Sequence, residues 1–166
     1  MSRFNGFGWR LTATVLAALV GAVIFPASVG AAPKTNSLSG QAVNGTGALS
    51  FNGAIHSDSD GSAVRGTFQV KTQLGNVTVD ATCLEVVAGI GGRIAGAAGA
   101  VKASTDPSLP VGAAVAVQAF DSDTSAVPDG LTLFLLGQVP GPNQCSPPSS
   151  PASPVSKGKL TIRQGV

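Results

Sequence analysis

An all-β domain is the fold class that this sequence predicts, with about eight antiparallel strands in a meander that closes into a small barrel. Several short runs alternate apolar and polar residues with a period of two, as strands with one buried face do. Glycine-rich pairs of turn residues separate these runs, and such tight turns make consecutive strands antiparallel neighbours. Closing the meander removes its exposed edges. A sandwich of two sheets is the alternative.

The alternation is clearest in the first half of the predicted domain. Apolar residues alternate with others over 49–55 and, most regularly, over 64–70. A further run covers 77–82, and after Cys83 the apolar positions shift by one residue, which predicts a β-bulge. The turn pairs between the runs are Asp60-Gly61, Gly75-Asn76 and Gly91-Gly92.

The second half is less regular. The alanines of 93–102 favour a helix, but its two glycines would each cost a helix interior about 1 kcal/mol, so we predict a strand. Alternation resumes over 111–120 and 131–135, on either side of Asp129-Gly130. A last short strand is expected around 160–162.

Residues 1–31 have the three zones of a secretory signal peptide. Arg3 and Arg10 make a basic start, the apolar run 11–25 follows, and small residues then suit a cut after Ala31. The apolar run has fifteen residues, whereas a membrane-spanning helix needs about 20, so a transmembrane anchor is the weaker interpretation. We therefore predict that a signal-peptide helix precedes the β-domain and that the protein is secreted into the extracellular space.

The rest of the chain has the size of one domain. Residues 32–36 are expected to form a flexible N-terminus and residues 37–166 a single β-domain. A Pro/Ser-rich stretch over 139–157 is expected to form a loop within that domain, because a linker would join two domains and only one short strand follows.

The two cysteines, Cys83 and Cys145, are predicted to form a disulfide, because an even count in an exported protein indicates one. Two free thiols are the alternative. A metal site made of two cysteines and the distant His56 is weaker still, because structural zinc takes four ligands.

Charge and aromatic content disfavour two classes of partner. Removing Arg3 and Arg10 with the signal peptide leaves eight basic and eight acidic residues, which gives no support for nucleic acid as a partner. No Trp or Tyr follows Ala31, so the usual stacking platform for carbohydrate is missing. We expect membrane contact only through the signal peptide during export.

Catalytic residues are not predicted. The single histidine, His56, could join Asp58 and a serine in a triad, but nothing in the sequence positions such a set. No Gly-x-Ser-x-Gly motif is present. With Glu85 as the only glutamate, a carboxylate pair for glycoside hydrolysis also lacks positive support.

A cluster of aspartates is the best candidate for a metal site. Asp121, Asp123 and Asp129 fall in one predicted loop, and carboxylates at such spacing suit a hard cation such as calcium. The EF-hand pattern fails, because Ala126 and Thr132 replace its glycine and closing glutamate. Ordinary turn chemistry of Asp and Ser is the alternative. No other cofactor is predicted.

Three stretches resemble a family of small secreted β-rich proteins of unknown function from high-GC Gram-positive bacteria. They are SFNGAIHSDSDGSAVRGTFQV (50–70), ATCLEVVAGIGGRIAGAAG (81–99) and VAVQAFDSDTSAVPDGLTL (115–133). A late cysteine, a Pro-rich loop and a final strand also match. The sequence departs from the family pattern at 88–91, where the usual Gly-Asn pair is missing. The family has no established activity, so the resemblance implies no functional residues.

The functional prediction is an exported, non-catalytic binding or structural β-domain. The alternatives are a carrier of a small apolar ligand inside the barrel, a calcium-binding secreted module and, least favoured, a hydrolase. The expected partner is a small apolar ligand or a component of the cell envelope. An internal cavity of a few hundred Å³ would favour the carrier, whereas a contiguous exposed apolar patch would favour an envelope or partner-binding role.

Overall fold

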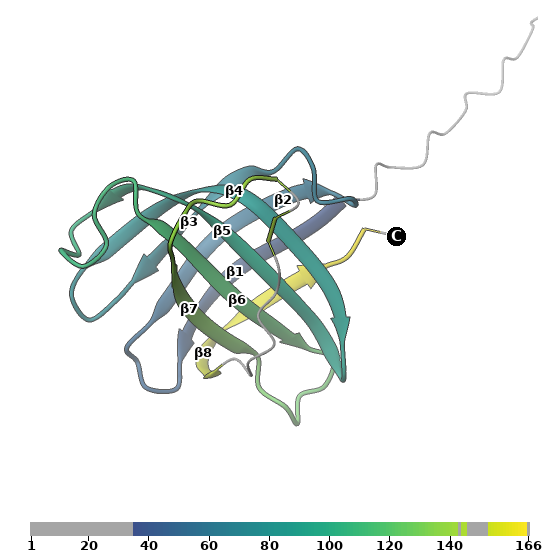
Figure 1. Cartoon of the computed structure of the whole chain (residues 1–166). Coiled ribbons are helices and arrows are strands. Elements are labelled where there is room, and N and C mark those ends of the chain that lie inside the picture. Colours follow the sequence, from purple (N-terminus) through teal and green to yellow (C-terminus); the bar gives the residue numbers. More distant parts are fainter. Residues whose placement is uncertain (1–34, 143, 146–152, 166) are drawn as a thin grey trace, which may run out of the picture. The chain divides into compact units, whose positions relative to one another are not determined.

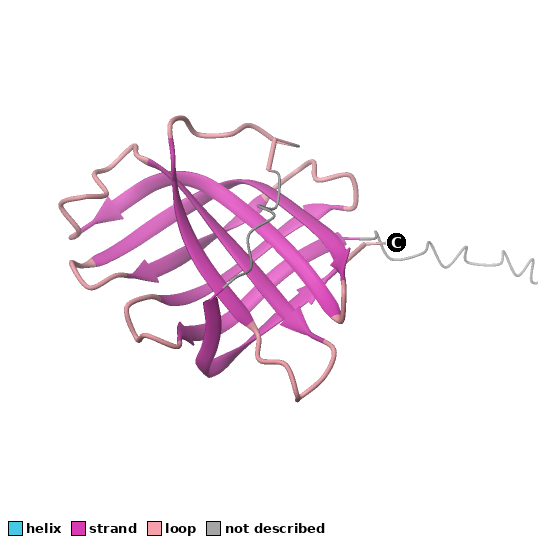
Figure 2. Ribbon diagram, turned by 60° about the horizontal axis from the view of Figure 1, so that its bottom comes forward, coloured by secondary structure: helices cyan, strands magenta, loops and turns pink. Residues whose placement is uncertain are grey.

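Eight antiparallel strands form one closed sheet in the computed structural model, which describes residues 35–142, 144–145 and 153–165 (Figure 1). Each strand pairs with its neighbours in chain order, and β8 pairs with β1. The part described contains strands and connecting loops and no helix (Figure 2). The strands are β1 Thr35–Asn44, β2 Ser50–Asp58, β3 Arg65–Lys71, β4 Asn76–Gly89, β5 Gly92–Ser104, β6 Ala114–Ser122, β7 Gly130–Leu136 and β8 Ser153–Arg163.

The predicted all-β meander closed into a barrel is therefore confirmed, and the sandwich is not formed. The signal peptide predicted over 1–31 lies outside the described residues. Residues 93–102, where helix and strand competed, belong to β5. Among the residues described, no helix has the length and apolar character needed to cross a bilayer.

Three predicted boundaries were wrong. β1 begins at Thr35, inside the segment expected to be flexible. The apolar alternation predicted a strand that starts at Val111, but Val111 lies in a loop. Gly112 has a φ of 88°, and β6 begins only at Ala114. β8 begins at Ser153, inside the expected Pro/Ser loop. In its first half only Val155 packs against the core, and the residues 156–159 are exposed, so the pairing there rests mainly on the backbone.

The β-bulge predicted near Cys83 is confirmed. The register of β4 against β5 shifts between Ala81 and Cys83. Beyond this shift the neighbours Cys83 and Leu84 are both buried. Leu84 belongs to the main core, whereas Cys83 packs in a separate small cluster with Cys145. The bulge thus lets one strand bury adjacent side chains in two different places.

The barrel interior is filled by aliphatic side chains around Phe68. This ring is fully buried and lies 6.0 Å from the ring of Phe51, centroid to centroid. Gly53 makes room for it, because a Cβ at Gly53 would lie 2.7 Å from the Cβ of Phe68. The core holds Leu, Ile, Val and Ala from every strand, including Leu38, Ile55, Val79, Ala97, Val117, Leu131, Leu160 and Ile162.

The turns divide between two ends of the barrel. Ser50 pairs with both Val43 and Lys71, so the turns that follow β1 and β3 lie at the same end. We call this the mouth end; it is on the left in Figure 1. It holds the turns 45–49, 72–75 and 105–113 and the start of the β7–β8 connection. The other, terminal end holds the turns 59–64, 90–91 and 123–129 and the ends of β1 and β8.

Candidate functional site

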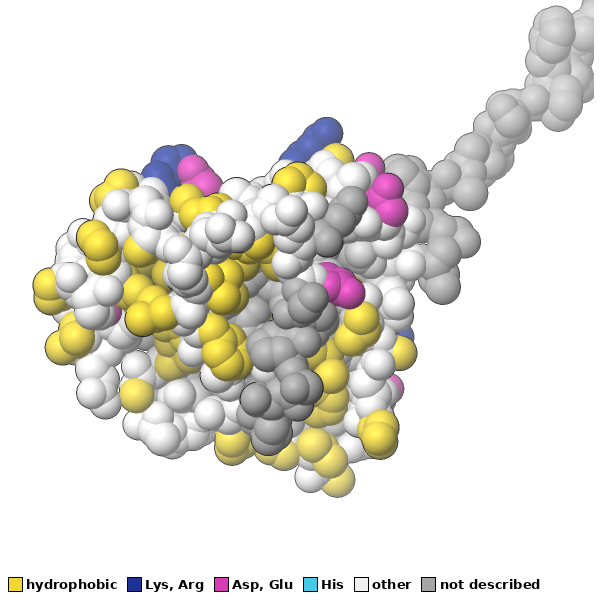
Figure 3. Space-filling model, in the orientation of Figure 1, with side chains coloured by type: hydrophobic (Ala, Val, Ile, Leu, Met, Phe, Trp, Pro, Cys, Tyr) yellow, Lys and Arg dark blue, Asp and Glu magenta, His cyan; other side chains and the backbone are white. Residues whose placement is uncertain are grey.

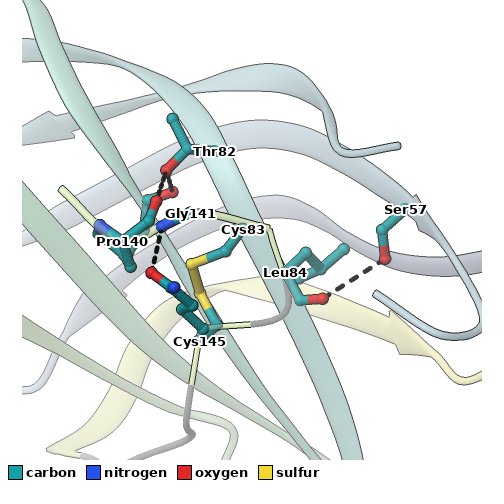
Figure 4. Close-up of a disulfide and its surroundings, with 9 residues drawn as sticks. Ser57, Thr82, Cys83, Leu84, Pro140, Gly141 and Cys145 are labelled. Carbon is teal, nitrogen blue, oxygen red and sulfur yellow. Dashed lines mark hydrogen bonds between the residues drawn. A yellow bond between two sulfur atoms is a disulfide. The ribbon is translucent and has the colours of Figure 1, made fainter. Parts of the chain in front are cut away.

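A disulfide joins Cys83 on β4 to Cys145 in the β7–β8 connection, as predicted (Figure 4). The two Cα atoms are 5.5 Å apart and the cysteines are separated by 62 residues in the chain. The hydroxyl of Thr82 donates a hydrogen bond of 2.6 Å to the carbonyl of Pro140, which holds the same connection against β4. A disulfide-bonded β fold of this kind fits an extracellular protein.

The disulfide lies over a small apolar surface on the outside of the barrel. Cys83 and Cys145 pack with Ala98 of β5 and Ala116 of β6. A cleft of about 350 Å³ lies beside them. Its apolar walls come from the outer faces of β5, β6 and β7 and from the β7–β8 connection, and include Ala98, Ala116, Phe134, Leu136 and Pro140.

The mouth end of the barrel contains the larger cavity, of about 480 Å³. The alternate residues Leu131, Leu133 and Leu135 of β7 all face it. Leu131 is fully buried, Leu133 is half-buried, and Leu135 is 65% exposed, so these side chains lead from the core to the opening. Six leucines line the cavity in all: Leu49, Leu74, Leu109, Leu131, Leu133 and Leu135.

One wall of the mouth is fixed by a buried carboxylate, that of Asp106, which is 3% exposed. Its Oδ1 accepts hydrogen bonds from the backbone N–H of Ser108, at 2.9 Å, and from the Ser108 hydroxyl, at 2.6 Å. Its Oδ2 accepts one from the hydroxyl of Thr72. These bonds connect the β3–β4 turn to the β5–β6 turn, and they lower the pKa of Asp106 below its ordinary value of 3.8, with Ser108 the larger cause.

Acidification is therefore expected to destabilise the folded protein by protonating Asp106 in the wall of the mouth. A lowered pKa means that Asp106 stabilises the folded state above pH 3.8, and this contribution is lost as the pH falls through the lowered pKa. Thermal melting from neutral pH to below 3.8 should show a steeper fall of Tm in the wild type than in Asp106→Asn, whose side chain does not titrate. Parallel profiles for the two proteins would contradict this assignment.

Hydrophobic side chains also gather around the opening. Leu74 in the β3–β4 turn is 63% exposed, and Leu135 of β7 is 65% exposed. In the space-filling view, hydrophobic side chains are exposed on the left, which is the mouth end, and also along the lower edge and on the right (Figure 3). Sequence reasoning identified none of the mouth residues as a site. Leucines in turns, where polar residues are usual, were the available signal.

The predicted calcium residues lie at the terminal end, where two of them bind the backbone of β8. Asp121 Oδ2 accepts a hydrogen bond from the N–H of Ile162, at 2.8 Å. Asp129 Oδ2 accepts one from the N–H of Leu160, at 2.9 Å. Asp123 instead approaches Arg93, with 3.8 Å between the charged atoms. In the described part of the chain, no three acidic, His or Cys side chains are arranged to hold a metal; calcium binding here stays a prediction.

Asp129 helps to close the barrel. β7 and β8 pair only at Gly130–Pro154 and Leu131–Ser153, the shortest ladder in the sheet. Further along β8, where β7 no longer pairs with it, the carboxylate of Asp129 accepts the hydrogen bond from the N–H of Leu160. The side chains of the β6–β7 turn thus complete the sheet beside β8.

Asp129→Ala is expected to lower the free energy of unfolding by about 1–3 kcal/mol, because the buried N–H of Leu160 loses its acceptor. Urea unfolding measures this loss. Asp123→Ala is the matched control from the same turn; its ion pair with Arg93 is exposed, so we expect a loss of only about 0–1 kcal/mol. Equal losses in the two variants would show that Asp129 does not hold β8.

The residues weighed for catalysis lie on the outside of the barrel. His56 is exposed on the outer face of β2, and Asp58 on the same face is also exposed. Asp58 Oδ2 accepts a hydrogen bond from the hydroxyl of Ser62 at 3.4 Å, within the β2–β3 turn. Both residues belong to the terminal end, away from the mouth.

Comparison with known proteins finds no family model, no curated protein and no solved structure that matches this chain. The resemblance to a family of small secreted proteins therefore stays a prediction. The candidate function has to be argued from the barrel itself.

Proposed function

We propose that this chain is an exported, non-catalytic binding protein that holds the apolar part of a small ligand, such as an acyl chain, in the mouth of its barrel. The observation that supports this most directly is the leucine-lined cavity of about 480 Å³. Its volume lies within the range of about 300–1,000 Å³ that is typical of small-molecule sites.

The distribution of packing in the barrel also supports binding at the mouth. Next to the terminal end the interior is filled, with Leu38, Ile55 and Ile162 fully buried. At the mouth Leu133 and Leu135 keep part of their apolar surface in contact with water. Covering that surface with an apolar ligand is favourable, at roughly 25 cal/mol for each Å² removed from water.

Export is the second part of the proposal. The zones of residues 1–31 are those of a signal peptide. The disulfide agrees with an oxidising compartment. A carrier outside the cell would need no catalytic group, and the mouth combines leucines with polar side chains such as Asn44, Gln73 and Thr132.

Titration with a fluorescent acyl-chain probe, cis-parinaric acid, tests the binding site. The probe should gain fluorescence with the wild type. Leu133→Gln places an amide in the cavity without a large change of volume, so the affinity should fall about tenfold. Ile90→Gln is the matched control, because Ile90 is fully exposed at the terminal end. A wild type that does not bind the probe, or Leu133→Gln binding as tightly as the wild type, would reject the site.

A further inference from the structure

One buried side chain in the wall of the mouth keeps unused hydrogen-bond donors. Asn44 is the last residue of β1, lines the cavity and is only 8% exposed. Among the described residues that line the cavity, only Asn44 and Asp106 are polar and more than nine-tenths buried. Buried polar groups normally have hydrogen-bond partners, so a donor without one needs a physical reason.

The turn 45–49 fixes the orientation of the Asn44 amide. The backbone N–H of Leu49 donates a hydrogen bond of 3.1 Å to Oδ1. An N–H can only donate, so the amide atom that faces it must be the oxygen. The hydroxyl of Thr46 donates a second hydrogen bond, also of 3.1 Å, to the same oxygen. Both bonds hold the oxygen against the turn, and Nδ2 lies on the other branch of the amide.

The Nδ2 atom of Asn44 has no hydrogen-bond partner in the part of the chain that the structure describes. It is not sealed inside the protein either, since the atom keeps some accessible surface. The open space beside this side chain is the mouth cavity. Two N–H groups are therefore available to an acceptor that a ligand brings into the cavity.

The other polar groups of the mouth are less suited to receive a ligand. The buried carboxylate of Asp106 already accepts three hydrogen bonds. Gln73 is exposed in the β3–β4 turn, so binding would first have to immobilise its side chain. Asn44 is already immobilised by the turn 45–49, and it loses little further freedom when it donates to a ligand.

The cavity offers no positive charge to a ligand. Of the described residues that line it, Asp106 alone is charged, and it is an anion. Lys71 and Lys157, on strands that border the cavity, are exposed on the outer face of the sheet, at positions that alternate with inward-facing residues. A ligand carboxylate would therefore share the cavity with Asp106 and lose water without a cation to replace it. A neutral carbonyl oxygen would accept from Nδ2 without that cost.

We propose that Asn44 donates a hydrogen bond from Nδ2 to the carbonyl oxygen of the ligand, so that the mouth prefers a neutral acyl ester to a free fatty acid. This inference rests on the proposed binding of an acyl chain in the mouth, and it adds the polar group that the ligand carries at the end of that chain. The leucines hold the chain, and Asn44 fixes the position of the carbonyl.

Titration of the wild type with cis-parinaric acid and with its methyl ester, both at neutral pH, tests the preference. The ester should bind about tenfold more tightly, because the carboxylate of the acid gives up water beside Asp106 with no cation to replace it. The side-chain amide signals of Asn44 in an NMR spectrum should also shift when the ester is added. Unchanged signals at saturation would overturn the contact with Nδ2.

Asn44→Asp separates the donor from the rest of the site. Aspartate keeps an oxygen for Leu49 and Thr46 but replaces the two N–H groups with a second oxygen. The affinity for the ester should fall about tenfold, as expected for a lost hydrogen bond beside a new charge. The primary alcohol of the same chain can donate its O–H to the new oxygen, so its affinity should change by no more than about twofold.

Asn52→Asp is the matched control, because it makes the same substitution at an exposed residue on the outer face of β2. It should bind the acid, the ester and the alcohol as the wild type does. A purely structural role of Asn44 predicts a different pattern, in which Asn44→Asp lowers the affinities for the ester and the alcohol by the same factor. That pattern would overturn the inference, and so would equal affinities of the wild type for acid and ester.

The same titrations distinguish this inference from the proposed function. A wild type that binds acid and ester equally well keeps the mouth as an acyl-chain site and removes only the role of Asn44. A wild type that binds neither probe would overturn both. If Asn44→Asp does not fold, the ratio of the two affinities and the amide signals of Asn44 still decide the matter in the wild type.

Discussion

Replacing both cysteines in the double variant Cys83→Ala, Cys145→Ala should lower the free energy of unfolding by about 4 kcal/mol. The bond closes a long loop, since the two cysteines are 62 positions apart in the chain, and the loss of chain entropy in the unfolded state sets this upper figure. Urea unfolding of the oxidised wild type and the double variant measures the difference directly.

Reduction of the wild type is the matched experiment. The reduced wild type should unfold at the same urea concentration as the double variant, because both lack the same constraint. A double variant as stable as the oxidised wild type would show that the β7–β8 connection is held by its other contacts, such as the hydrogen bond from Thr82 to Pro140.

Phe68→Ala should cost about 3–5 kcal/mol, the usual range for deleting a fully buried ring. Phe68 is 0% exposed and packs tightly against Gly53, where a Cβ would lie 2.7 Å from the Cβ of Phe68. The neighbouring strands are paired on both sides and cannot collapse fully into the cavity that the substitution leaves. Thermal and urea unfolding both report this loss.

Phe134→Ala is the control for ring size. Phe134 is only half-buried and lies in the outer cleft, on the other face of the sheet from the core. Its loss should be clearly smaller than that of Phe68. If the two variants lose equal stability, the centre of the core does not lie at Phe68.

The fold was predictable because most of its strands are amphipathic. The run 64–70 alternates almost perfectly, and in the structure Phe68 and Val70 are buried while Thr67 and Gln69 are exposed. The bulge near Cys83 was also predictable from the sequence, because one inserted residue shifts the later apolar residues from odd to even positions. Local pattern and global fold agree along most of the chain.

The errors occur where backbone geometry replaces the side-chain pattern. β8 pairs through its backbone over the exposed residues 156–159, and Gly158 lets it approach β1 closely. A Cβ at Gly158 would lie 2.1 Å from the carbonyl oxygen of Gln41. Val111 continues an apolar alternation in the sequence but belongs to a turn. The path of the turn exposes its side chain, and the period-two pattern of a strand does not apply there.

The candidate site could not be predicted from the sequence because it is made by closure of the barrel. Leu49, Leu109 and Leu133 come from different connections and strands and meet only when β8 pairs with β1. Closure of the barrel also gives a structural role to two of the aspartates that the sequence suggested as a metal site. Asp121 and Asp129 contact β8, which follows them by about thirty to forty residues in the chain.

The division between the two ends is the feature that links fold and function. The turns 45–49 and 72–75 carry no charged residue, and they line the cavity together with the turn 105–113, whose one charged residue, Asp106, is buried. The turns and strand ends of the terminal end carry charges of both signs: Asp58, Asp60, Asp121, Asp123 and Asp129 beside Arg65, Arg93 and Arg163. A meander places alternate connections at the same end. Residues of connections far apart in the sequence therefore meet around one opening.

Chemical-shift mapping with cis-parinaric acid tests the central claim most directly. Backbone amide signals of the turns 72–75 and 105–113 and of β7 should shift on titration, while those of the turns 59–64 and 123–129 should stay unchanged. Shifts confined to the terminal end or to the outer cleft beside Cys145, or no shifts at all, would contradict a ligand site in the mouth of the barrel.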